Sequence, residues 1–325
     1  MKETLASLLS RRLLLVTGKG GTGKTRIAAA LGVLAARRGV RTVVVELGDS
    51  DVLPELLPPT HPARAAERGR EPQPVAENLF TLRLVPEEAL LEYLELQLRV
   101  RTLARAIVGN AAFHRFLDAA PGWRELLTLG KLWHLASLED SAGAPRWPLV
   151  VVDAPATGHG LSLLSVPSVV LDTVRMGPLR RNTDRVQGLM TDAARTLVLP
   201  VTLPEELPVN ETLELRARVR ELGVGLGPVL ANGIEPALGL DQPERALAAL
   251  ERVPRGQAPS PLAEPDVVGA AARHRLARAA MQRGFLDELA RGLDEAPVEL
   301  PWLARGVDDP AGVRALADAL GGALA

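Results

Sequence analysis

The chain contains no cysteine, so disulfides, thiolate metal sites and cysteine nucleophiles are all excluded. Aromatic residues make up only 3% of its 325 residues and the net charge is −1. Both features argue against a nucleic-acid partner, because stacking platforms and a general attraction to polyanions are missing. There is no run of about 18 apolar residues to cross a membrane, and residues 1–12 lack the apolar core of a signal peptide. We therefore expect a cytoplasmic protein.

Lysine is scarce as well, since only four of the 38 basic residues are lysines. Two of these, Lys19 and Lys24, lie in one glycine-rich segment that follows the apolar run at 13–16. Residues 18–25 read Gly-x-x-x-x-Gly-Lys-Thr, the phosphate-loop pattern, and an alanine-rich helical stretch follows at 26–38. The motif requires this order of strand, loop and helix. A glycine-rich connector that binds nothing is therefore the weaker interpretation.

The chemistry of a phosphate loop gives each of its residues a role. Glycines permit a tight turn in which backbone N–H groups face a polyphosphate, and the dipole of the following helix adds to the attraction. Lys24 is expected to contact the β- and γ-phosphates, and the Thr25 hydroxyl to bind Mg²⁺. The residues expected to bind ATP here are Gly18, Gly20, Gly21, Thr22, Gly23, Lys24, Thr25 and Arg26.

A second signal is the apolar run at 149–152, which ends in Asp153. A buried parallel strand of this kind presents its carboxylate at the edge where open α/β sheets bind ligands. Asp153 is therefore predicted to hold Mg²⁺ through water. We expect residues 153–164 to form a loop, with rigid Pro155 and flexible Gly158, that responds to a γ-phosphate. The next helical region is expected at 167–194.

The lysine directly after the first glycine resembles the deviant phosphate loop of a large ATPase class. That class includes the nitrogenase iron protein, the septum-site and partition ATPases, and the arsenite-pump and tail-anchored-protein targeting ATPases. The segment Thr157-Gly158-His159 after Asp153 closely resembles the switch of the last two, although Ala154 and Pro155 are displaced by one position from its commonest form. The match thus narrows to one family.

This resemblance implies a dimer, either a homodimer or a heterodimer with a related ATPase. Lys19 would act in catalysis by crossing the two-fold interface to the partner's nucleotide; the alternative is an intrachain contact or a solvated lysine. Asn232 would recognise adenine; the alternative is a turn asparagine before Gly233. A protein client, with membrane-associated proteins among the candidates, would bind the helical segment 86–140; the alternative is that the apolar stripes of these helices belong to the ordinary core.

The sequence departs from the family in two ways. Without cysteines, neither the metalloid site of arsenite pumps nor a thiolate zinc bridge can form. The family's water-orienting aspartate has Gly48 at its position, and Asp49 comes one residue later. We place Asp49 as the water-orienting catalytic residue, with Asp51 behind it; the alternative is a solvated loop acid.

The remaining pattern predicts an α/β fold, with a mostly parallel sheet flanked by helices. We expect a single ATPase domain over 1–325 that contains the helical insertion 86–140, and no internal repeat is present. Asn210 is a candidate N-cap of a helix that ends near Leu222. Residues 54–73 are expected to form a mobile loop or short helices, and 236–261 helix and loop. Further strands are expected at 41–47, 79–85, 195–201, 227–232 and, at the edge, 297–303, and further helices at 86–108, 110–136, 267–293 and 311–320.

Three functions fit these observations. The first is an ATPase whose nucleotide state opens and closes a dimer around a client. The second is a small-molecule kinase or ligase on the same fold, although no acid–base cluster besides the phosphate machinery is evident. The third is a nucleotide-dependent scaffold with little hydrolysis, which Gly48 favours. The chain has only four methionines, which argues against a methionine-lined client groove.

Overall fold

The computed structural model describes residues 3–47, 52–60, 71–98, 122–239, 242–256 and 260–325, together with the isolated residues 102, 108 and 110. Asp49 and Asp51 lie outside the described residues. So does most of the stretch between the two described helices of segment 86–140.

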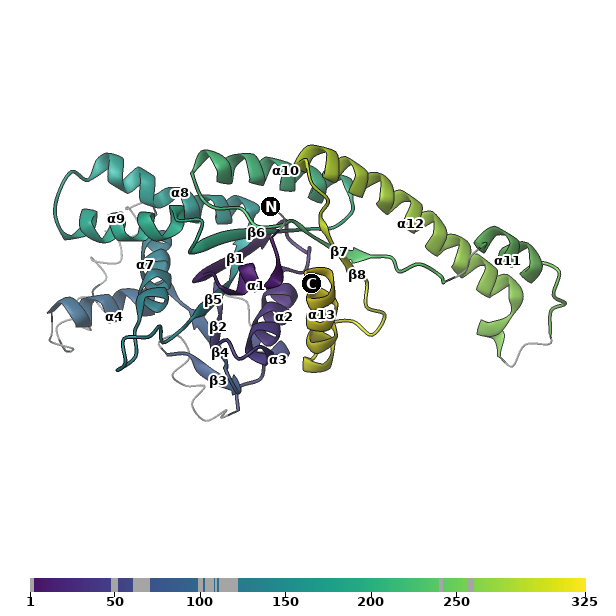
Figure 1. The fold of residues 1–325 in the computed structure, drawn as a ribbon, viewed down its shortest axis with the longest axis horizontal. Coiled ribbons are helices and arrows are strands. Elements are labelled where there is room, and N and C mark those ends of the chain that lie inside the picture. Colours follow the sequence, from purple (N-terminus) through teal and green to yellow (C-terminus); the bar gives the residue numbers. More distant parts are fainter. Residues whose placement is uncertain are drawn as a thin grey trace.

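One sheet runs through the middle of the molecule, with helices on both faces (Figure 1). Its strand order is β3-β4-β2-β5-β1-β6-β7-β8, and every pair is parallel except β3 with β4. The predicted fold class is therefore confirmed. The strands are β1 (Leu13–Gly18), β2 (Thr42–Leu47), β3 (Gln73–Ala76), β4 (Leu79–Leu84), β5 (Leu149–Ala156), β6 (Thr196–Thr202), β7 (Leu230–Ile234) and β8 (Val298–Pro301).

Side chains of the central strands alternate between two apolar cores. Leu14 and Val16 of β1 join the core under α2 and α13, whereas Leu13 and Leu15 join the core under α7, α8 and α10. Every residue of β1 is buried, as a parallel strand covered on both faces requires. The helices are α1 (Leu5–Leu9), α2 (Lys24–Arg37), α3 (Leu53–Leu56), α4 (Pro86–Leu98), α7 (Trp123–Ser137), α8 (Thr157–Thr173), α9 (Pro178–Thr191), α10 (Glu206–Glu221), α11 (Pro243–Leu250), α12 (Pro265–Leu293) and α13 (Pro310–Ala323).

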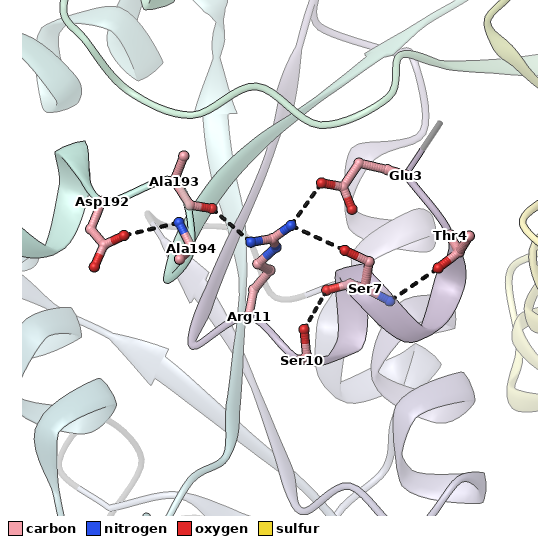
Figure 2. A network of polar contacts seen from close by, with 8 residues as sticks. All are labelled: Glu3, Thr4, Ser7, Ser10, Arg11, Asp192, Ala193 and Ala194. Carbon is pink, nitrogen blue, oxygen red and sulfur yellow. Dashed lines mark hydrogen bonds and ion pairs between the residues drawn. The ribbon is translucent and has the colours of Figure 1, made fainter. Parts of the chain in front are cut away.

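The N-terminal helix α1 is tied to the sheet by one arginine, and the sequence pattern did not predict this helix. Arg11 Nη1 donates to the carbonyl of Ala193 at 2.9 Å, just before β6. Its Nη2 donates to Glu3 at 2.7 Å and to the Ser7 hydroxyl at 3.1 Å (Figure 2). The guanidinium thus joins the start of the chain to the turn that leads into β6.

The segment after Asp153 is helical earlier than predicted. Strand β5 passes directly into α8 at Thr157, so the expected loop at 153–164 and the expected helix start at 167 are wrong. Ser162 lies within this helix, where its Oγ donates to the Gly158 carbonyl at 3.2 Å. Leu163 and Leu164 are buried against the sheet, and this packing outweighs the low helix propensity of the segment.

The predicted N-cap at Asn210 is also wrong. Helix α10 begins at Glu206 with Glu205 as its N-cap, which places Asn210 inside the helix. Pro208 lies in the first turn, where a missing N–H costs the helix nothing. Asn210 is therefore of a residue type that is common at N-caps, but it lies within the helix and not at its start.

The chain between β7 and β8 forms an arm. Helix α12 leaves the body of the molecule and carries α11 near its far end (Figure 1). Its buried residues are concentrated in the half nearer the sheet, from Gln282 to Leu293. The predictions of a helix at 267–293 and of an edge strand at 297–303 are confirmed in α12 and β8.

Candidate nucleotide-binding site

The loop after β1 adopts backbone angles that only glycine takes easily. Gly21 and Gly23 have φ of +85° and +93°, in the left-handed region. Gly18 has φ of +152°, and a Cβ on it would lie 2.1 Å from the Val201 carbonyl oxygen. A Cβ on Gly23 would lie 2.5 Å from Nδ2 of Asn232. Glycine is thus required at 18 and 23 for close approach as well as for the turn.

The loop closes on itself through hydrogen bonds to one carbonyl. The Thr22 hydroxyl donates to the Lys19 carbonyl at 2.9 Å, and Lys24 Nζ donates to the same oxygen at 3.0 Å. Burial lowers the pKa of the Lys24 ammonium, and the charge of Asp153 partly opposes this shift. Lys24 therefore points into the concave side of the loop, where a phosphate group would lie.

Thr25 and Asp153, the two residues expected to hold Mg²⁺, meet at the carboxyl edge of the sheet. The Thr25 hydroxyl donates to Oδ2 of Asp153 at 2.6 Å. The other carboxylate oxygen, Oδ1, is buried and has no hydrogen-bond partner among the described residues. Burial raises the pKa of Asp153, while the bond from Thr25 and the charge of Lys24 lower it. A buried acceptor oxygen beside a hydroxyl suits a hard cation, so these residues fit Mg²⁺.

Lys19 does not point at Lys24 but forms an ion pair with Glu211 of α10. The other oxygen of Glu211 lies 3.3 Å from the Thr157 hydroxyl, which donates to it. One carboxylate therefore joins the loop lysine to the first residue of α8. Both partners of the ion pair are about one-third exposed, which is compatible with exchange for another anion.

Thr157, Gly158 and His159 form the first turn of α8, and both Gly158 and His159 are exposed. The end of β5 just before them is held to β1, because the Thr17 hydroxyl donates to the Pro155 carbonyl at 2.9 Å. The predicted switch residues therefore lie beside the phosphate loop, with their backbone in a helix rather than in a loop.

Asn232 lies against the phosphate loop. Its Nδ2 donates to the Thr22 carbonyl at 2.9 Å. Strand β7 continues for two residues beyond it to Ile234, so Asn232 is not the strand's last residue as predicted. Arg26 is turned away from the loop, and donates to the Val307 carbonyl at 3.0 Å and pairs with Asp308.

A pocket of about 310 Å³ opens beside Asn232 and Gly23. Several of its wall residues were not identified from the sequence, although the scarcity of aromatics makes Trp302 conspicuous within the predicted edge strand at 297–303. No sequence pattern marks the two wall residues from α12, Arg278 and Gln282. The pocket is also lined by Arg26, Leu203, Pro204, Pro301, Leu303 and Val307.

Outside the phosphate loop, the described residues offer neither a metal cluster nor a membrane-spanning helix. They contain no cluster of three or more acidic or histidine side chains arranged to hold a metal ion. None of the helices within them is long and apolar enough to span a membrane.

Comparison with known proteins agrees with this geometry. The model of the anion-transporting ATPases matches residues 11–182, more than half of the chain. ATPase BagA of Mycobacterium tuberculosis is 32% identical over 311 residues, which cover 91% of this chain and 89% of that protein. ATPase GET3C of Arabidopsis thaliana is 23% identical over 286 residues, covering 71% of this chain and 69% of that protein. The ATPase ASNA1 homolog of Entamoeba dispar is 24% identical over 264 residues, covering 68% of this chain and 76% of that protein. The chain therefore belongs to the anion-transporting ATPase family, as its phosphate loop and switch segment predict.

Proposed function

We propose that the protein binds MgATP and hydrolyses it to ADP and phosphate. The observation that carries this proposal is the contact between Thr25 and Asp153, which leaves a buried carboxylate oxygen free beside the phosphate loop among the described residues. Mg²⁺, when bound, would neutralise phosphate charge and lower the cost of breaking the bond to the γ-phosphorus. Thr25 would hold it directly and Asp153 through water.

Other residues of the chain take the remaining parts of the reaction. The backbone N–H groups of 18–23 would bind the phosphates, and Lys24 would exchange its bond to the Lys19 carbonyl for one to the β- and γ-phosphates. Asn232 would hold adenine at the neighbouring pocket. Water attacks the γ-phosphorus, and the bond to the β–γ bridging oxygen breaks. Asp49 is proposed to orient this water.

The deviant lysine supports a dimeric enzyme. Lys24 already supplies the cation of an ordinary phosphate loop, so Lys19 is available for a second nucleotide once it leaves Glu211. On this proposal, ATP brings two subunits together, and each Lys19 reaches the partner's phosphates in the manner of an arginine finger. The partner would be a second copy of the chain or a related ATPase. We place the assembly in the cytoplasm.

The helical segment 86–140 is proposed to bind a protein client. Its described helices α4 and α7 lie between β4 and β5 in the chain, and α7 packs against α8, which begins at Thr157. A change at the first turn of α8 therefore has a direct packing route to α7. Hydrogen exchange with and without MgATP tests this proposal, since unchanged protection at 86–140 would remove the coupling.

A nucleotide-dependent scaffold with little hydrolysis is the second candidate, because Gly48 occupies the position of the family's water-orienting aspartate. Single-turnover hydrolysis of ATP, measured with dilute protein and with protein concentrated enough to dimerise, separates the two. Turnover that rises with protein concentration supports the ATPase. Tight binding of ATP without turnover in either state supports the scaffold.

A further inference from the structure

One buried amide fastens the end of β7 to the arm. Gln282 of α12 is only 4% exposed. Its Nε2 donates to the Gly233 carbonyl at 3.0 Å, and its Oε1 accepts from the Glu235 N–H at 2.8 Å. A carboxamide can donate and accept at the same time, which neither a carboxylate nor an apolar side chain of this length can do. The chain that leaves β7 is thus held at two backbone groups by one side chain.

The first of these backbone groups belongs to the residue next to Asn232. Gly233 has φ of +71°, and the pairing of β7 with β8 shifts register between Ala231 and Ile234, so the strand is irregular at this point. Glycine has more backbone freedom than any other residue, so Gly233 by itself does not fix the direction of the Asn232 side chain. That direction therefore depends on the hydrogen bond that holds the Gly233 carbonyl. Asn232 itself donates to the Thr22 carbonyl at 2.9 Å, which makes it the link between this turn and the phosphate loop.

The acid after this turn is held by the same helix. Glu235, whose side chain is 5% exposed, pairs with Arg275 at 2.6 Å and approaches Arg278 at 3.9 Å. Arg278 lies one helical turn before Gln282, and both line the pocket beside Asn232. This part of α12 therefore lines the pocket and also holds the end of β7 in place.

We propose that Gln282 is a positioning residue for nucleobase recognition, holding Asn232 in the orientation that reads adenine. This inference rests on the proposed binding of MgATP and adds to it a residue outside the phosphate loop and switch. Because Gln282 lies outside the phosphate loop and would act on the base through Asn232, its loss should weaken binding only of ligands that carry the base.

The test compares ligands with and without a base. Gln282→Met keeps the length and shape of the side chain but removes both hydrogen bonds, and Gln282→Glu keeps only the acceptor. Arg273→Ala is the matched control, since Arg273 lies on the same helix and pairs with the exposed Glu251. Isothermal titration calorimetry measures the affinity of the parent and each variant for MgATP, MgGTP and inorganic tripolyphosphate, and circular dichroism checks that each variant is folded.

We expect Gln282→Met to bind MgATP roughly tenfold more weakly, the effect of about one lost buried hydrogen bond. Its affinity for tripolyphosphate should equal that of the parent, and its preference for MgATP over MgGTP should fall. The affinity of Gln282→Glu for MgATP should lie between those of the parent and Gln282→Met. The affinity of Arg273→Ala should equal that of the parent. If Gln282→Met fails to fold, Gln282→Glu gives the same comparison.

Two results would overturn the inference. One is an equal loss of affinity for MgATP and tripolyphosphate, which assigns Gln282 to the general stability of the site. The other is an unchanged ATP preference in a folded variant. If the parent itself binds MgATP no better than Lys24→Ala does, the proposed function fails and the inference fails with it. If only the Gln282 comparison fails, MgATP binding still stands.

Discussion

The Thr25 hydroxyl and Oδ2 of Asp153 are joined by a hydrogen bond of 2.6 Å, although the residues lie 128 positions apart. Parallel pairing of β1 with β5 sets this contact, because it brings Asp153 level with Val16, two residues before the loop begins. The pairing of the two strands therefore holds the two side chains together. Such an arrangement lowers the cost of ordering the groups that would hold Mg²⁺.

Asp153→Asn should separate metal-dependent hydrolysis from nucleotide binding. The substitution keeps the shape and a hydrogen-bond acceptor for Thr25 but removes the charge that would act on the ion. We expect turnover to fall by roughly 100-fold or more, as when a charge-stabilising group is lost, with little change in the affinity for metal-free ATP. Asp172→Asn, an exposed acid on α8, is the control. Equal loss of metal-free binding and turnover would assign Asp153 a structural role.

Gly23→Ala tests the close approach of Asn232 to the phosphate loop. A Cβ there would lie 2.5 Å from Asn232 Nδ2, and the backbone has φ of +93°. A left-handed conformation costs a non-glycine residue about 1–2 kcal/mol even before the clash. The affinity for MgATP should therefore fall at least tenfold, measured by calorimetry. Gly188→Ala, in α9 and outside the proposed site, is the control, because its Cβ would meet no atom within 4 Å. Equal losses in both variants would contradict this account.

Residue patterns predicted the centre of the site well and its outer parts poorly. The phosphate loop and Asp153 could be identified from the sequence because their geometry depends on neighbouring residues. The loop needs glycines for its turn, and the carboxylate needs only a place at the end of a strand. The start of α8 was missed because the packing of Leu163 and Leu164 decides it, and this packing depends on the sheet. Gln282 was missed for the same kind of reason, since its partners lie 49 and 47 positions away.

Lys19→Ala should lose turnover while retaining much of its affinity for MgATP. The proposal gives Lys19 a role toward the partner's nucleotide, so the parent's specific activity should rise with protein concentration. Lys19→Arg is the control that keeps the charge but not the compact ammonium. Mixing Lys19→Ala with Asp153→Asn should restore part of the turnover, because one site of the mixed dimer is then complete. A strictly monomeric parent with full activity would contradict this role.

His134 of α7 should be neutral at pH 7. Burial lowers its pKa below the usual value of 6.5, the charge of Lys131 lowers it further, and Glu92 opposes the shift. Below pH 6.5 the unfolded chain then binds more protons than the folded one, so the free energy of unfolding contains a term that is present above pH 6.5 and is lost as the pH falls from there through the lowered folded pKa. NMR titration of the imidazole measures the pKa, and urea unfolding of the parent and His134→Gln at pH 5.5 and 8 measures the term. A folded pKa above 6.5 would contradict the prediction.

The most direct test of the central claim is calorimetric titration of the parent and Lys24→Ala with MgATP, together with phosphate release by both proteins. Lys24 is held inside the loop by the Lys19 carbonyl, so its removal takes away the cation for the β- and γ-phosphates without removing a core side chain. The account predicts saturable binding and phosphate release by the parent, and loss of binding or turnover in a folded Lys24→Ala. A folded Lys24→Ala that binds and hydrolyses MgATP like the parent would contradict it.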